Sequence, residues 1–220
     1  MAVAATRVPL LESLDWPAVR QHYDVRIDVH KELRNLNNKG SVAKFAELAL
    51  GVSDADGNYS AAEHGLGPKV LGLNLRAEQR VFDLAAQFMA LTEARDVPTL
   101  IKQARLQYLQ IGVGSEISCM VNPDVCWVAN TRTIWTHLVI KHGYDIAKAE
   151  AELAAYRDDD ATSEMAYAAW TEIHSKLDVA LTHVAKIGQE RAKKSGVTPG
   201  SVVYIWADAI ASHMYGMYHD

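Results

Sequence analysis

Apolar residues recur at helical spacing along most of the chain. Between residues 161 and 195 they alternate in steps of four and three, which places them on one continuous stripe of a helix. The stripe consists of Ala166, Trp170, Ile173, Leu177, Ala180, Val184 and Ile187. This pattern predicts a long helix that packs against a partner along its whole length.

Polar caps and glycine stops predict further helices on both sides of this stripe. Asp15 and Pro17 suit the first turn of a helix over 15–38, and Ser41 suits the start of a shorter one. The same signals predict helices over 74–95, 96–109, 124–143 and 145–157, and a last one from about residue 200. We therefore expect an all-α fold of seven or eight helices, packed as a bundle or orthogonally.

Two segments combine signals of different structure types. Residues 23–30 alternate apolar and charged side chains as a half-buried strand does, although the strong helix formers that follow favour a helix. Residues 53–72 are rich in glycine and predict an irregular stretch. We expect this stretch to separate a small N-terminal helical part from the main bundle, within one domain spanning residues 1–220.

Composition indicates a compartment and limits the partners. The N-terminus lacks a basic segment followed by a long apolar run, and no apolar run reaches the roughly 18 residues of a membrane span. Cys119 and Cys126 are the two cysteines and form no repeated framework. We expect a cytoplasmic protein without a membrane span. The net charge of −5 gives no support for nucleic-acid binding.

Motifs for metals and phosphates are incomplete. The segment 54–60 begins like a calcium-binding EF-hand loop, but Tyr59 and Gly65 stand where that loop needs glycine and glutamate. An Asx-rich turn explains the segment better. The nine histidines form neither a Glu-x-x-His nor a His-Glu-x-x-His motif, and Gly112 and Gly114 belong to no complete phosphate loop. We expect no metal and no cofactor.

An arginine and a histidine separated by four residues, Arg132 and His137, form the candidate catalytic pair. Arginine stabilises charge that develops on a phosphate, and histidine moves the proton of an attacking hydroxyl. The pair resembles the motif of HEPN-type helical ribonucleases, in which it lies at the start of a helix and two copies meet across a dimer. Thr133 stands where that family prefers Asn, His or Asp. The resemblance implies RNA cleavage by Arg132 and His137.

A structural role for the same window stays open. On one helix, Cys126, Asn130, Thr133 and His137 would form a polar stripe that satisfies hydrogen bonds between packed helices.

The C-terminal segment is rich in side chains typical of protein interfaces. Tyr204, Trp206, His213 and Tyr215 bury large areas at little entropic cost, either in the chain's own core or against a second subunit. Our first hypothesis is therefore a self-associating binding protein that acts through its surfaces, as a homo-oligomer or with another protein. The alternative is the ribonuclease, and a ligand pocket between helices is a third possibility that the sequence does not separate from the first.

Overall fold

The computed structural model describes residues 9–156 and 167–219, apart from the side chains of residues 9 and 167–170. Helices make up 76% of these residues, and no strand occurs among them. The all-α prediction is confirmed. The predicted number of helices is wrong, because the described chain contains 12 helices, 10 of them with seven or more residues.

The helices follow one another with short connections. The longer ones are α2 (Trp16–Asn38), α3 (Val42–Ala49), α5 (Leu66–Leu73), α6 (Ala77–Met89), α7 (Val97–Ala104), α8 (Ile111–Val121), α9 (Thr131–Lys141), α10 (Ile146–Tyr156), α11 (Tyr167–Lys194) and α12 (Val203–His219). The shorter ones are α1 (Pro9–Glu12), α4 (Tyr59–Glu63) and the two 3-10 turns η1 (Ala55–Gly57) and η2 (Ala94–Asp96).

Glycines that suggested irregular structure instead allow close packing. The segment 53–72 contains η1, α4 and most of α5, so the predicted irregular stretch is corrected. A Cβ atom on Gly57 would lie 1.9 Å from the carbonyl oxygen of Leu48. In α8, which the sequence did not predict, a Cβ on Gly114 would lie 2.6 Å from the side chain of Ile101. At Gly57 the neighbouring backbone leaves no room for a side chain, and at Gly114 the side chain of Ile101 would have to move.

The start of α9 also differs from the prediction. Asn130 caps this helix by accepting hydrogen bonds from the backbone N–H groups of Arg132 and Thr133, and Thr133 completes a capping box. Residues 126–129 before it are buried and lie outside any helix. The helix therefore begins at Thr131, not near residue 124. At the other end of the chain, residues 23–30 belong to α2, which Asp15 caps as predicted.

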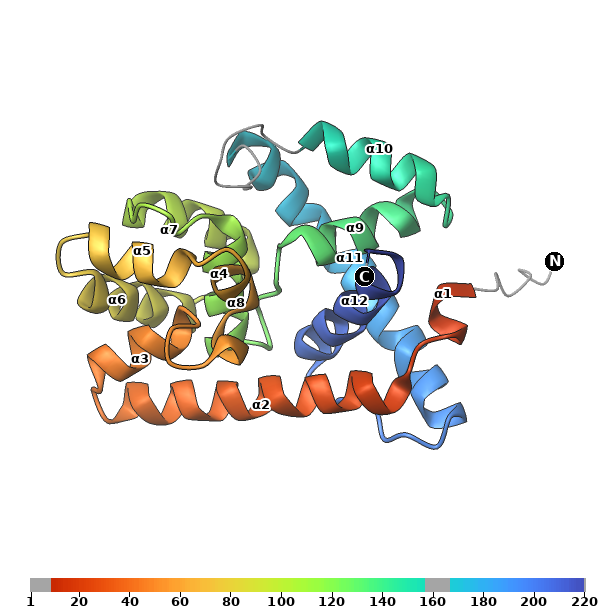
Figure 1. The fold of residues 1–220 in the computed structure, drawn as a ribbon, viewed down its shortest axis with the longest axis horizontal. Coiled ribbons are helices and arrows are strands. Elements are labelled where there is room, and N and C mark those ends of the chain that lie inside the picture. Colours follow the sequence, from red (N-terminus) through yellow and green to blue (C-terminus); the bar gives the residue numbers. More distant parts are fainter. Residues whose placement is uncertain (1–8, 157–166, 220) are drawn as a thin grey trace.

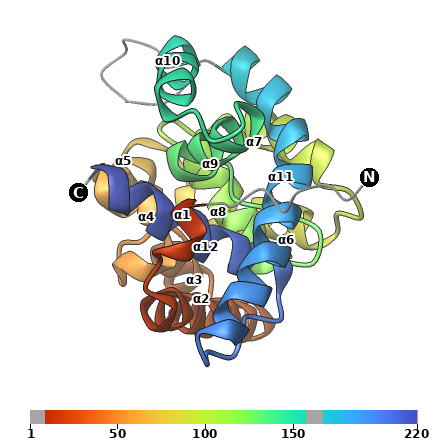
Figure 2. The same ribbon diagram turned by 90° about the vertical axis from the view of Figure 1, so that its right-hand side faces the viewer.

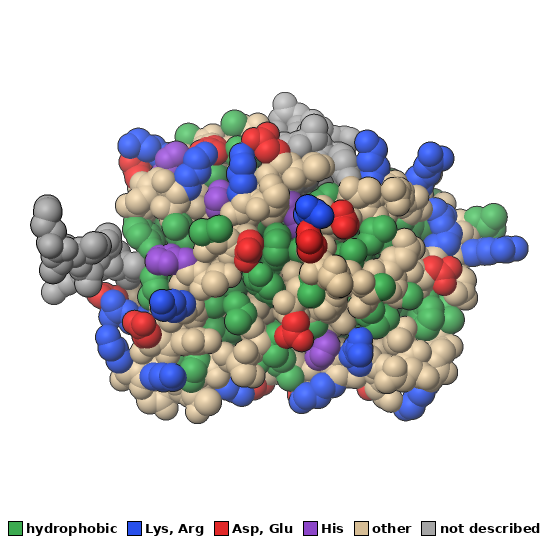
Figure 3. All heavy atoms as spheres, turned by 180° about the vertical axis from the view of Figure 1, so that it is seen from behind, with side chains coloured by type: hydrophobic (Ala, Val, Ile, Leu, Met, Phe, Trp, Pro, Cys, Tyr) green, Lys and Arg blue, Asp and Glu red, His purple; other side chains and the backbone are tan. Residues whose placement is uncertain are grey.

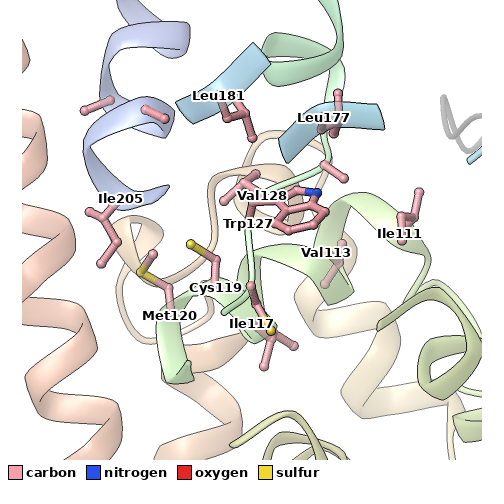
Figure 4. Close-up of a cluster of buried hydrophobic side chains, with 14 of the residues drawn as sticks. Ile111, Val113, Ile117, Cys119, Met120, Trp127, Val128, Leu177, Leu181 and Ile205 are labelled. Carbon is pink, nitrogen blue, oxygen red and sulfur yellow. The ribbon is translucent and has the colours of Figure 1, made fainter. Parts of the chain in front are cut away.

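Helix α2 connects the two sides of the molecule. It runs along the lower edge of Figure 1, beneath α3 and α8 on one side and α12 on the other. Helices α9, α10, α11 and α12 pack together on that second side, as the turned view in Figure 2 also shows. Buried apolar residues from Leu10 to Met214 form one continuous core. Its centre brings α8, the segment after it, α11 and α12 together around Trp127 (Figure 4).

The long stripe on α11 packs inside the chain. Ile173, Leu177, Ala180 and Val184 are buried, and Ile187 is partly buried against the core. Helices α12 and α9 are the main partners of α11. Ala166 and the side chain of Trp170 lie outside the described residues. The described part of the stripe therefore needs no second subunit to cover it.

Candidate functional site: a polar cleft above a buried ion cluster

A cleft of about 620 Å³ opens where α2, α4, α9 and α12 meet. The side chains that give it chemical character are His22 of α2, Tyr59 and Glu63 of α4, Arg132 of α9, and Ser212, His213 and Tyr215 of α12. Small-molecule pockets in proteins typically measure about 300–1,000 Å³. The cleft is therefore large enough for a small ligand.

Two imidazole rings lie side by side in the cleft. The ring of His22 lies between those of Tyr59 and His213, with centroids 5.2 and 5.6 Å away. Burial, reinforced by the charge of Arg26, lowers the pKa of His22 to about 3. Burial also lowers the pKa of His213 from its usual value. Both imidazoles are therefore neutral at pH 7.

Beneath these rings, Arg26 is completely buried. Its Nη1 donates to the backbone carbonyl of Asp56 at 2.6 Å, and its Nη2 donates to Glu116 at 3.3 Å. Its Nε lies 3.8 Å from a carboxylate oxygen of Asp208, and the guanidinium carbon lies 4.9 Å from the centroid of the Tyr59 ring. One cation thus holds two carboxylates that come from α8 and α12. We call Arg26, Glu116 and Asp208 the ion cluster.

Glu116 links the starts of α4 and α9. Its carboxylate accepts hydrogen bonds from the backbone N–H groups of Tyr59 at 2.8 Å and Ser60 at 3.0 Å. It also accepts from the Ser60 hydroxyl at 2.5 Å and from the side-chain amide of Asn130 at 3.2 Å. A carboxylate at these N–H groups satisfies donors that the helix itself leaves unpaired. Glu116 thereby fixes the two helix ends that carry the Tyr59 and Arg132 side chains into the cleft.

Asp208 is the least well compensated member of the ion cluster. Burial raises the pKa of this carboxyl to about 6, against the opposing effect of Arg26. Glu116, the second carboxylate beside the same guanidinium, raises it further. Asp208 therefore takes up a proton in mildly acidic solution, where an exposed aspartate stays ionised.

Arg132 lies at the edge of the cleft and bridges α9 to α4. Its Nη2 donates to Glu63 at 3.2 Å, and the two side chains are 29% and 55% exposed. Because water surrounds this ion pair, it contributes little to stability and can open when a ligand competes for either partner.

The structure places His137 apart from the cleft that contains Arg132. The step of five positions from one to the other corresponds to a rotation of about 140° around a helix. The charged groups that affect His137 are Lys141, Glu152 and Lys176, on the α10 and α11 side, and burial lowers its pKa. Arg132 instead faces Glu63 and the rings of the cleft. Their role as a catalytic pair stays a prediction.

The interface candidates of α12 take different positions. Trp206 is fully buried beside Trp16 and Tyr23, which places it in the chain's own core, one of the two positions that the sequence left open. Tyr204 donates a hydrogen bond to Asp178 of α11 at 2.7 Å. His213 and Tyr215 both line the cleft.

Sequence analysis did not single out His22, Tyr59 or the ion cluster. A signal for the cluster was present, because Glu116 and Asp208 are each the only charged residue within a long apolar run. Charged residues are almost never fully buried unless they are paired. A lone carboxylate in such a run therefore indicates a buried ionic partner, although the sequence does not identify it as Arg26.

The segment that resembles a calcium loop has a structural explanation. In the segment that resembles a calcium loop, the Asp54 side chain accepts a hydrogen bond from the backbone N–H of Asp56, which forms an Asx turn. Asn58 is buried and donates to the backbone carbonyls of Ala49 and Val113.

Within the described ranges, no three His, Cys, Asp or Glu side chains are grouped to hold a metal ion. None of the described helices has the length and hydropathy to cross a membrane.

The face drawn in Figure 3 carries both signs of charge. Lysine and arginine side chains are scattered over it among aspartates and glutamates, without a continuous basic stripe among the described residues of that face. In comparisons with known proteins, no family model, curated protein or solved structure matches the chain.

Proposed function

We propose that the chain is a helical binding protein and that its ligand occupies the cleft between α2, α4, α9 and α12. The observation that supports this function best is the convergence of polar side chains from four helices above one buried ion cluster. Removing charges from water costs free energy that their attraction often fails to recover. We therefore expect the ion cluster to contribute less to stability than to the position of the helices that line the cleft.

A thermal-shift screen tests this function. Three classes of compound are added separately to the protein: neutral saccharides, phosphorylated sugars and nucleotides, and free amino acids. We expect at least one class to raise the melting temperature progressively as its concentration increases, because a ligand that binds only the folded state stabilises it.

The screen is repeated with two matched variants. Arg132→Gln changes the cleft, and Arg191→Gln changes an ion pair with Glu12 of similar geometry (3.0 Å, 30% and 41% exposed) elsewhere on the surface. The ligand-induced shift is expected to shrink with Arg132→Gln alone. Equal shifts in both variants, or no shift with any compound in the wild type, would contradict the proposal.

Self-association is a second candidate function, supported by apolar side chains at the end of α12. Met217 and Tyr218 are 48% and 49% exposed, and both also line a smaller cavity beside Leu10. We expect a homo-oligomer that uses this end of α12, so Tyr218→Ser should lower the molar mass measured by light scattering at micromolar concentration. A monomeric wild type would contradict it.

A further inference from the structure

We propose that the ligand of the cleft is an uncharged, polyhydroxylated small molecule, namely a short neutral saccharide. This inference rests on the proposed binding function and adds the chemical class of the ligand.

The charges around the cleft favour neither a cation nor an anion. Arg132 and Glu63 neutralise each other at its edge, and the two imidazoles are neutral at pH 7. Burial also keeps the Tyr59 phenol protonated by raising its pKa. Beneath the lining, Arg26 is paired with both carboxylates of the ion cluster, so it offers no free positive charge to an anion. An anion would approach Glu63, and a cation would approach Arg132, so each would meet a like charge.

Hydrogen-bonding groups in the cleft suit a ligand that both donates and accepts. The Ser212 hydroxyl and Nε2 of His22 are buried and have no hydrogen-bond partner in the described chain. Buried polar atoms are rarely left unpaired, because each unpaired group loses its hydration without compensation. A serine or tyrosine hydroxyl donates one hydrogen bond and accepts others, while Arg132 only donates and ionised Glu63 only accepts. Hydroxyl groups on a ligand complement all of these groups at once.

The aromatic rings complete the match with a sugar. Tyr59, Tyr215 and the two imidazoles present ring surfaces to the cleft beside the polar groups. A pyranose ring has C–H groups that pack on such surfaces and hydroxyls at its rim that form hydrogen bonds. A neutral saccharide of one to three rings therefore has the two surfaces that the cleft requires.

Isothermal titration calorimetry tests the ligand class with named probes. The neutral probes are maltotriose, cellotriose and tri-N-acetylchitotriose, and the charged probes are glucose 6-phosphate, AMP and glutamate. We expect at least one neutral probe to bind and the charged probes to bind at least tenfold more weakly.

Ser212→Ala is the decisive variant because it removes a hydroxyl that makes no hydrogen bond with the described residues. The unliganded variant should melt at or above the wild-type temperature, since no protein bond is lost. Its Kd for the neutral probe should rise about five- to tenfold, the effect of one hydrogen bond. The control Ser175→Ala removes an exposed serine hydroxyl of α11 and should leave the Kd unchanged.

Each other outcome overturns the inference in a distinguishable way. Binding of charged probes alone, weakened by Arg132→Gln, would refute the saccharide and leave the proposed binding function standing. Saccharide binding that Ser212→Ala and Arg132→Gln both leave unchanged would refute the cleft as its site. Absence of binding by all six probes would refute the saccharide, and the broader screen above would then decide the binding function.

Discussion

Helices α2 and α12 meet in two adjacent buried clusters of opposite chemistry. In the first, the Trp206 ring packs against Trp16 and Tyr23, with centroids 6.1 and 5.7 Å apart. About one helical turn further along, Arg26 approaches Asp208 to 3.8 Å. The same two helices thus bury an aromatic cluster and an ionic one side by side.

The two clusters contribute differently to the fold. The aromatic cluster stabilises it through the apolar area removed from water, in proportion to that area and almost independently of pH. The ionic cluster has a net effect that depends on every partner being present and correctly charged. Only the ionic cluster reaches α4 and α9, through Glu116, and so only it fixes the walls of the cleft.

The largest expected effect comes from removing the cation of the ion cluster. Arg26→Met leaves Glu116 and Asp208 buried without their counterion, so we expect a loss near the upper end of about 3–5 kcal/mol in the free energy of unfolding, measured with urea. The control Arg20→Met breaks a surface pair with Asp24 that is 31% and 51% exposed. It should cost less than about 1 kcal/mol. Equal costs for the two variants would show that the two buried carboxylates do not depend on Arg26 as their counterion.

Truncating the aromatic cluster should have a slightly smaller effect. Trp206→Ala should lower the free energy of unfolding by about 4 kcal/mol, because it leaves a cavity in the core. The molar mass in solution should stay the same as long as the variant is folded, since the side chain is fully buried within one chain. If the variant instead dissociated an oligomer without losing stability, the position of Trp206 in the core would be refuted.

Acid should weaken the protein through its buried histidines. Burial lowers the pKa of His174 from 6.5 to about 4, and neither ring nitrogen has a hydrogen-bond partner among the described residues. The unfolded chain takes up protons near pH 6.5 and the folded chain does not. The stability contribution is therefore complete above about pH 6.5 and falls as the pH drops toward 4, by about 1.4 kcal/mol per pH unit and per group.

His174→Phe isolates this contribution, since it keeps the stacking on Trp127 and removes the titrating group. The free energy of unfolding, measured with urea, should fall between pH 7 and pH 5 by about 2 kcal/mol less in this variant than in the wild type. Asp208 acts in the opposite direction. Because its folded pKa is raised from 3.8 to about 6, its contribution is present below pH 3.8 and is lost as the pH rises through 6. An unchanged pH dependence in His174→Phe would contradict a neutral buried His174.

The smallest stability change is expected at the edge of the cleft. Arg132→Gln should alter the free energy of unfolding by less than about 1 kcal/mol, because its pair with Glu63 is exposed to water.

The same variant and His137→Ala also test the ribonuclease hypothesis in an assay with single-stranded RNA. We expect no cleavage by the wild type, because the two side chains lie in different surroundings. Cleavage that both variants abolish would establish the ribonuclease instead.

Much of the fold follows from local signals in the sequence. The Asp15 cap, the helical spacing over 23–38 and the stripe from Ile173 to Ile187 act within a few turns, and the structure has helices at all three. Glycine was misleading, since it marks both loops and places where helices touch. Gly57 and Gly114 lie where two segments touch, and this is visible only once the positions of Leu48 and Ile101 are known.

The candidate site could be predicted only in small part. Arg132, His213 and Tyr215 were identified, but for roles in catalysis or self-association and not as parts of one cleft. The ion cluster joins residues separated by 90 or more positions, and pairing over such distances leaves no local pattern. The residue type also does not reveal whether an arginine is buried or exposed, and only packing distinguishes Arg26 from Arg132.

The location of the bound ligand tests the central claim most directly. In an amide NMR titration of the ¹⁵N-labelled protein with the best-binding saccharide, we expect the largest shift changes at His22, Tyr59, Arg132 and residues 212–216. Weaker changes should reach Ser60, whose backbone N–H donates to Glu116. Shift changes confined to other surfaces, with the amides of His22, Tyr59 and Arg132 unmoved at saturation, would contradict the account.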